Sequence, residues 1–140
     1  MSDPAYGFTL RLPGVSYEDA RQRIIDALAA EGFGILTEID VAGTLKKKLG
    51  VDFRKYAILG ACNPPLAHRA LEAEPLIGLL LPCNVVVAEE DGGSVVALLS
   101  PKAIFQLVGN PRVEGLADEV EAKLRRALQS LAPAGSRGAS

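Results

Sequence analysis

Apolar and polar residues follow one another along the chain in patterns that predict alternating strands and helices. From Tyr6 to Leu12 the two kinds of residue alternate, which is the period of a half-buried strand. Between Ser16 and Glu31 apolar residues recur three and four positions apart, which indicates an amphipathic helix. Ser16 is a typical N-cap residue, Asp19 completes a capping box, and Gly32 is a typical helix stop.

The next segment repeats this order of strand and helix. The stretch "GILTEIDV" predicts a second strand with Ile35, Thr37 and Ile39 on one face. Apolar residues four positions apart then predict a short helix over residues 41–49, and Gly50 is its natural end. Three consecutive lysines stand in the last turn of this helix, where the helix dipole favours positive charge.

A third strand and a second short helix follow. The stretch "YAILGAC", residues 56–62, predicts the strand, and Asn63-Pro64 supplies an N-cap and a proline suited to a first helical turn. This helix should end near Ala73, because the residue before Pro75 is biased out of the helical conformation. The apolar residues 76–81 fit either a helical turn or the start of a strand.

The last part of the chain predicts a hairpin and a long helix. The stretches "CNVVVAEE" and "SVVALLS" flank Asp91-Gly92, whose residue types favour a tight hairpin turn. A long amphipathic helix then begins with acidic residues and ends with basic ones. Its apolar face consists of Val113, Leu116, Val120, Leu124 and Leu128. Because two long helices must bury their apolar faces on the strands, the pattern predicts a layered α+β domain.

Composition narrows the class of protein. The 140 residues, 49% hydrophobic and 23% charged, suit one domain, which we assign to residues 1–132 with a flexible tail over 133–140. A net charge of -2 argues against a nucleic-acid partner, and the longest apolar run is too interrupted for a membrane span. The first residues lack the pattern of a signal peptide, so we expect a cytoplasmic protein with reduced cysteines.

Both cysteines of the chain precede an asparagine, at Cys62-Asn63 and Cys83-Asn84, on either side of the second short helix. Around these two steps the sequence resembles the family of domain of unknown function 302. The resemblance rests on "LGACNP" from Leu59, on "AL" at residues 70–71 and on "IGLLLPCNVVV" from Ile77, with "ID" at residues 39–40 and "LKKKLG" fitting upstream. It extends from about Thr9 to the last helix.

The resemblance implies an α+β fold with an antiparallel, meandering sheet of about five strands. It further implies two long helices packed on one face, short helical excursions between strands, and a homodimer. It implies no reaction, and any cofactor stays unknown. The matched motif positions are Cys62, Asn63, Pro64, Pro82, Cys83 and Asn84.

The direction of the two strands that carry the cysteines decides whether they form one site. If these strands were parallel, Cys62 and Cys83 would lie at opposite edges of the sheet, roughly 20 Å apart. If they are antiparallel, as the resemblance favours, both thiols lie at one edge beside the start of the Asn63-Pro64 helix. Such a helix start favours anions and lowers the pKa of a thiol.

This arrangement predicts a binding or sensing site for a small anion, a soft metal or a redox signal. The candidate residues are Cys62, Asn63, His68, Cys83 and Asn84, with Cys62, Cys83 and His68 as weak metal candidates. Two alternatives stay open. In one, Cys62 is the nucleophile of a thiol enzyme. In the other, both cysteines are inert residues of a structural dimer, since cysteine is often buried.

Two further features bear on function. The basic residues Lys46, Lys47, Lys48, Arg54 and Lys55 form a local cluster, which we interpret as a solvated helix end rather than an anion site. The segments 79–87 and 95–99 are almost continuously apolar, which is typical of strands that are buried on both faces. Helices can cover one face. We expect a second copy of the chain, or a bound apolar ligand, to cover the other.

Overall fold

Five antiparallel strands form one sheet in the computed structural model, which describes residues 3–132. The strands are β1 (Gly7–Pro13), β2 (Gly34–Asp40), β3 (Tyr56–Cys62), β4 (Cys83–Glu90) and β5 (Gly93–Leu99). Their order across the sheet is β1-β5-β4-β3-β2, so β2 to β5 form a meander and β1 closes the far edge beside β5. The predicted α+β class and meandering antiparallel sheet are confirmed. The expected tail at 133–140 lies outside the described residues.

Helical segments connect β1 to β2, β2 to β3 and β3 to β4, and others follow β5. They are α1 (Tyr17–Ala30), α2 (Val41–Leu49), α3 (Pro64–Ala73), η1 (Pro75–Leu80), α4 (Pro101–Phe105), η2 (Gln106–Val108) and α5 (Pro111–Gln129). The caps follow the sequence: the side chain of Ser16 accepts a hydrogen bond from the Asp19 amide, and Gly50 ends α2 in the left-handed conformation. No helix within residues 3–132 is both long and apolar enough to cross a membrane.

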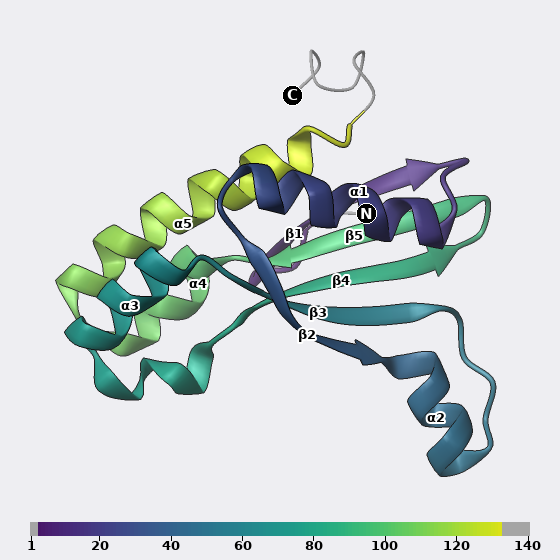
Figure 1. Ribbon diagram of the computed structural model, residues 1–140, viewed down its shortest axis with the longest axis horizontal. Helices are drawn as coiled ribbons and strands as arrows, with labels where there is room; N and C mark the ends of the chain where they lie inside the picture. The colour runs from purple at the N-terminus through teal and green to yellow at the C-terminus, as the bar shows by residue number, and fades with distance from the viewer. Residues whose placement is uncertain (1–2, 133–140) are drawn as a thin grey trace.

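The two longest helices, α1 and α5, lie along the same side of the sheet (Figure 1). Burial follows from this layering. On α1 the residues Ala20, Ile24 and Leu28 are fully buried, and the strand residues beneath the helices include Leu59 and Val85, which are equally inaccessible. This layer between helices and sheet is the hydrophobic core that holds the fold together.

The opposite side of the sheet remains partly open. Pairing between neighbouring strands aligns Ile39, Ile58, Val86 and Ala97 in one row across β2, β3, β4 and β5. Opposed residues of antiparallel strands point to the same face, so these four share the face away from α1 and α5. Val86 and Ala97 stay half-buried although their strands are central, and Ile39 is 50% exposed. We call this row and its neighbours the open sheet face.

A β-bulge in β2 changes the face of one residue. Ile35 pairs with Ala61, whereas Thr37 pairs with the next residue, Gly60, and the register shifts between them. Ile35 therefore packs against the core beneath the helices, while Thr37 and Ile39 lie on the open sheet face. The prediction that all three share one face is wrong, because a bulge inserts one residue into the alternation.

The ambiguous segment after α3 is the 3-10 helix η1, and a short helix that the sequence pattern did not predict, α4, follows β5. Ser100 caps α4 by accepting a hydrogen bond from the Ala103 amide. The Ser100 hydroxyl in turn donates to the buried carboxylate of Glu121 on α5. These contacts hold α4 against α5 and so fix the end of the sheet where the cysteines lie.

Candidate functional site

The two cysteines meet at one end of the sheet. Cys62 ends β3 and Cys83 begins β4, and Ala61 lies directly opposite Cys83 in the antiparallel register. Both cysteines are free, Cys83 buried and Cys62 half-buried, and both line the same cavity. The prediction that antiparallel strands bring the two thiols to one edge is confirmed.

The cavity has a volume of about 330 Å³ and a lining that is almost entirely apolar. Its walls come from the ends of β3 and β4 and from helices α3, α4 and α5, which are far apart in sequence. Besides the cysteines, its lining includes Leu66, Ala67, Ala70, Phe105, Leu116 and Val120. A concave apolar space of this size is typical of a site for a small molecule.

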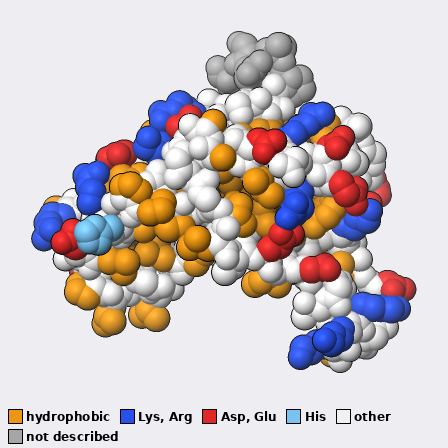
Figure 2. All heavy atoms as spheres, viewed as in Figure 1, with side chains coloured by type: hydrophobic (Ala, Val, Ile, Leu, Met, Phe, Trp, Pro, Cys, Tyr) orange, Lys and Arg blue, Asp and Glu red, His pale blue; other side chains and the backbone are white. Residues whose placement is uncertain are grey.

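Exposed leucines border the cavity. Leu36 and Leu71 line it and are 66% and 41% exposed. Leu76 and Leu79 of the adjoining η1 are more exposed still, at 74% and 85%. In Figure 2 hydrophobic atoms gather at the lower left, over α3 and η1. The mouth of the cavity is therefore part of an apolar surface.

The start of α3 offers little to an anion. Pro64 and Pro65 have no backbone N–H, the Leu66 amide donates to the side-chain oxygen of Asn63, and the Ala67 amide donates to the Asn63 carbonyl. The side-chain amide of Asn63 donates to the carbonyl of Glu31. Asn63 thus lines the cavity with its polar groups already engaged, and the first turn of α3 has no unpaired amide among these described residues.

The pKa of the Cys83 thiol is shifted in the direction opposite to the one that the sequence predicts. Burial, with a smaller contribution from the neighbouring Cys62, raises the pKa of Cys83 to about 11. A lowered pKa would need unpaired amides or a nearby cation, and the surroundings of Cys83 are apolar. At neutral pH this thiol is uncharged, so the expectation of a lowered pKa is wrong for Cys83.

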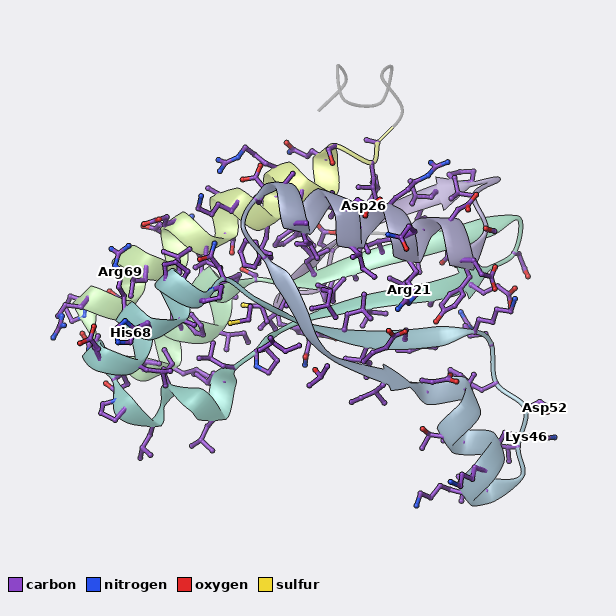
Figure 3. The ribbon with its side chains drawn as sticks, in the orientation of Figure 1. Arg21, Asp26, Lys46, Asp52, His68 and Arg69 are labelled. Atoms are coloured by element: carbon purple, nitrogen blue, oxygen red, sulfur yellow. The ribbon has the colours of Figure 1, made fainter. Side chains whose placement is uncertain are left out.

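Two of the other candidate residues lie away from the cavity. His68 is on the outer side of α3, where its ring is 3.7 Å from the carboxylate of Glu72 (Figure 3). Asn84 is exposed on the open sheet face, opposite Gly60. The structure brings Cys62, Asn63 and Cys83 together and leaves His68 and Asn84 apart. Within residues 3–132, no group of three or more His, Cys, Asp and Glu side chains could hold a metal ion.

The basic cluster predicted around Lys46 and Lys55 lies at the other end of the molecule, where these lysines form ion pairs with different acidic residues. Lys46 forms an ion pair with Asp52 at 2.9 Å, and both are labelled beside α2 in Figure 3. Lys55 forms an ion pair with Glu18 of α1 at 2.7 Å. These exposed pairs are typical of solvated side chains, and they lie far along the sheet from the cysteines.

A larger cleft, of about 880 Å³, lies at the opposite end of the sheet beside the turn between β4 and β5. Its lining is polar and carries charges of both signs, among them Arg11 and Glu90, which form an ion pair. Because the charges oppose one another and the cleft is open, it has no preference for one kind of ligand. The cavity beside the cysteines remains the better candidate site.

Sequence reasoning missed the cavity's far wall. Leu116 and Val120 stand on the predicted apolar face of the last helix, which indicated burial but not a cavity. Phe105 belongs to α4, which the pattern did not predict. The only available signal was the pair of small residues Ala67 and Ala70 on α3, which leave space next to the cysteines.

The fold and cavity define a class: a small α+β domain in which a meandering antiparallel sheet carries an apolar, ligand-sized cavity at one end. The family model described as "Domain of unknown function DUF302" matches residues 8–131, and the chain belongs to this family. Among curated proteins, none matches.

A solved structure has the same fold. It is the crystal structure of an uncharacterized conserved protein DUF302 from Bacillus stearothermophilus, with a TM-score of 0.81 and 30% sequence identity. The similarity covers 88% of this chain and 95% of that chain. Family membership and fold agree with the resemblance seen around the two Cys-Asn steps, and neither assigns a reaction.

Proposed function

We propose that this chain is a homodimeric binding or sensing domain whose ligand site is the cavity beside Cys62 and Cys83. One observation carries the proposal: two free cysteines from neighbouring strands line a single apolar cavity of about 330 Å³ that is open to the surface. A concave, mostly apolar space of this size is typical of a site for a small molecule.

The open sheet face supports the homodimer. The apolar row of Ile39, Ile58, Val86 and Ala97 would be buried if two copies packed face to face. Beside this row Phe53, which is 47% exposed, contacts Tyr56 with the ring centroids 6.0 Å apart. A two-fold axis places the same patch on both partners, so an apolar face suits a second copy of itself.

The geometry gives less support to a metal site or to the active site of a thiol enzyme. Among residues 3–132, a soft metal would have only the two thiols nearby, since His68 is on the outer side of α3. A thiol enzyme would need a base beside Cys62, and the described lining of the cavity contains no titratable side chain other than the cysteines. A redox role for the two neighbouring thiols is compatible with the binding proposal.

Native mass spectrometry of freshly purified protein tests the proposal. We expect an additional non-covalent mass on the wild-type protein, lost under denaturing conditions. Ala67→Phe, which places a ring in the cavity, should abolish this mass. Ala29→Phe, the same change at an exposed position of α1 outside the cavity lining, should retain it. A wild-type protein that never carries extra mass, from any expression medium, would favour inert cysteines in a structural dimer.

A further inference from the structure

We propose that the cavity beside Cys62 and Cys83 binds a neutral, largely apolar molecule, and not the small anion or soft metal that the Cys-Asn steps first indicate. This inference rests on the proposed function, because it names the ligand class of the same site.

The lining opposes a charged ligand. The side chains of Leu66, Phe105, Leu116 and Val120 can replace the contacts that an apolar molecule has with other apolar groups. They cannot replace the hydration shell of an anion or a cation, and a charge that loses water without gaining hydrogen bonds is strongly destabilised. The same lining stabilises an apolar molecule, because each square ångström of apolar surface removed from water is favourable.

The polar groups beside the cavity do not offset that cost. Asn63 uses its side-chain oxygen for the Leu66 amide and its side-chain nitrogen for the Glu31 carbonyl. Pro64 and Pro65 remove two amides that a helix start would otherwise offer to an anion. Burial keeps Cys83 protonated at neutral pH, so it contributes a neutral thiol. A neutral thiol packs well against apolar and aromatic groups.

The volume sets the size of the ligand. An engineered apolar cavity of about 150 Å³ in another protein binds benzene. A cavity of about 330 Å³ therefore accommodates roughly twice as many non-hydrogen atoms, which corresponds to a molecule of about two fused rings. Part of a slightly longer molecule could extend through the open mouth.

The mouth of the cavity also favours a neutral, largely apolar ligand. Leu36 and Leu71 line the cavity and stay exposed, and Leu76 and Leu79 continue this apolar surface along η1. Water-exposed leucines at the entrance provide an apolar surface to which an apolar molecule can bind before it enters the cavity. An occupant that covers Leu36 and Leu71 also removes apolar area from water, which adds to its affinity.

A matched pair of probes tests the ligand class. 1-Naphthylmethanol is neutral, whereas 1-naphthoate has nearly the same shape and carries a charge at pH 7. We expect isothermal titration calorimetry on the full chain to give at least about tenfold tighter binding for the alcohol, a difference of about 1.4 kcal/mol. Ala67→Phe should weaken binding of the alcohol by at least about tenfold, and Ala29→Phe should leave it unchanged.

A second cavity-filling variant keeps the test valid if Ala67→Phe fails to fold. Gly78 lines the cavity, and an added Cβ there meets nothing within 4 Å, so a side chain can start there without a backbone clash and Gly78→Phe adds a ring at the cavity wall. It should weaken the alcohol's binding as Ala67→Phe does, while circular dichroism stays that of the wild-type protein.

The outcomes separate the ligand class from the proposed function. Tighter binding of naphthoate, lost in both filling variants, would overturn the neutral ligand class and leave the cavity as the site. Binding of the alcohol that neither filling variant weakens would overturn the inference, because it would place the apolar site elsewhere. If neither probe binds and the native protein carries no extra mass, both the inference and the proposed function fail.

Discussion

Asn63 caps α3 by accepting a hydrogen bond from the backbone amide of Leu66 at 3.4 Å. The same side chain donates from its nitrogen to the carbonyl of Glu31, at the end of α1, also at 3.4 Å. One residue therefore satisfies orphan groups at the ends of two helices and ties the wall of the cavity to the layer that covers the sheet. This explains an asparagine after Cys62 without any ligand.

The asparagines of the two Cys-Asn steps should differ sharply in how much each contributes to the stability of the protein. Asn63→Ala removes both hydrogen bonds and should lower the free energy of unfolding by about 1 to 2 kcal/mol. Asn63→Asp keeps the cap but loses the donor to Glu31, so its effect should be intermediate. Asn84→Ala is the matched control, since Asn84 is exposed, and it should change stability by less than about 0.5 kcal/mol. Urea unfolding measures all three, and equal losses at both positions would contradict this account.

The buried thiol of Cys83 should make stability fall at alkaline pH. Its pKa is raised from an ordinary value of 9.0 to about 11, so the folded state holds the proton longer than the unfolded state does. The stabilisation is fully present below pH 9 and is lost as pH rises through 11, by up to about 3 kcal/mol. Unfolding measured from pH 8 to 11 should show this loss.

Cys83→Ala supplies the reference for the alkaline experiment. Without the thiol, the part of the alkaline loss that Cys83 causes should disappear, although stability at pH 7 falls because buried volume is removed. Wild-type and Cys83→Ala curves that run parallel from pH 8 to 11 would contradict the raised pKa.

Glu121 should contribute to the loss of stability at acidic pH. Burial alone raises its pKa, but hydrogen bonds from Ser100, from the Lys102 amide and from Arg125 outweigh burial and lower it. Its contribution is present above pH 4.5 and is lost as pH falls through the lowered folded value. Glu121→Gln should cost about 1 to 3 kcal/mol at pH 7 and should weaken the loss of stability below pH 4.5.

The control for Glu121 is another acidic residue of the same helix. Glu114 is exposed in the first turn of α5, and Glu114→Gln should change stability by less than about 1 kcal/mol. Chemical denaturation at pH 3, 4, 5 and 7 separates the two variants. A Glu121→Gln protein with the acid sensitivity of the wild type would show that the carboxylate is not held as described.

The open sheet face should control association. Val86 sits between Ile58 and Ala97 in the apolar row, so Val86→Lys places a charge at its centre. Light scattering should give about twice the chain mass of 14.7 kDa for the wild type and the single-chain mass for Val86→Lys. Gln129→Lys, which adds the same charge at an exposed position of α5, should remain dimeric. A wild-type protein of 14.7 kDa would refute the homodimer.

Most of the fold could be predicted because local patterns and long-range packing agree. The alternation in β3 and the turn residues Asp91-Gly92 specify their elements without reference to the rest of the chain. The bulge beside Ile35 could not be predicted, since it depends on how β2 pairs with β3. The short α4 is also held from a distance, through the contact between Ser100 and Glu121.

The candidate site could be predicted only in part. The convergence of Cys62 and Cys83 follows once β3 and β4 are taken as antiparallel. The charge preference of the site could not be predicted, because it depends on which amides at the start of α3 are already paired. Nor could the cavity, since its walls include Phe105 and Leu116, which only the tertiary fold brings to the cysteines.

The most direct test of the central claim is methyl nuclear magnetic resonance of Leu- and Val-labelled protein titrated with 1-naphthylmethanol. We expect chemical-shift changes concentrated on Leu66, Leu116 and Val120, which line the cavity, with Val86 and Val95 of the open sheet face unaffected. Shifts confined to the open sheet face, or none anywhere at saturating probe, would contradict a ligand site beside the two cysteines.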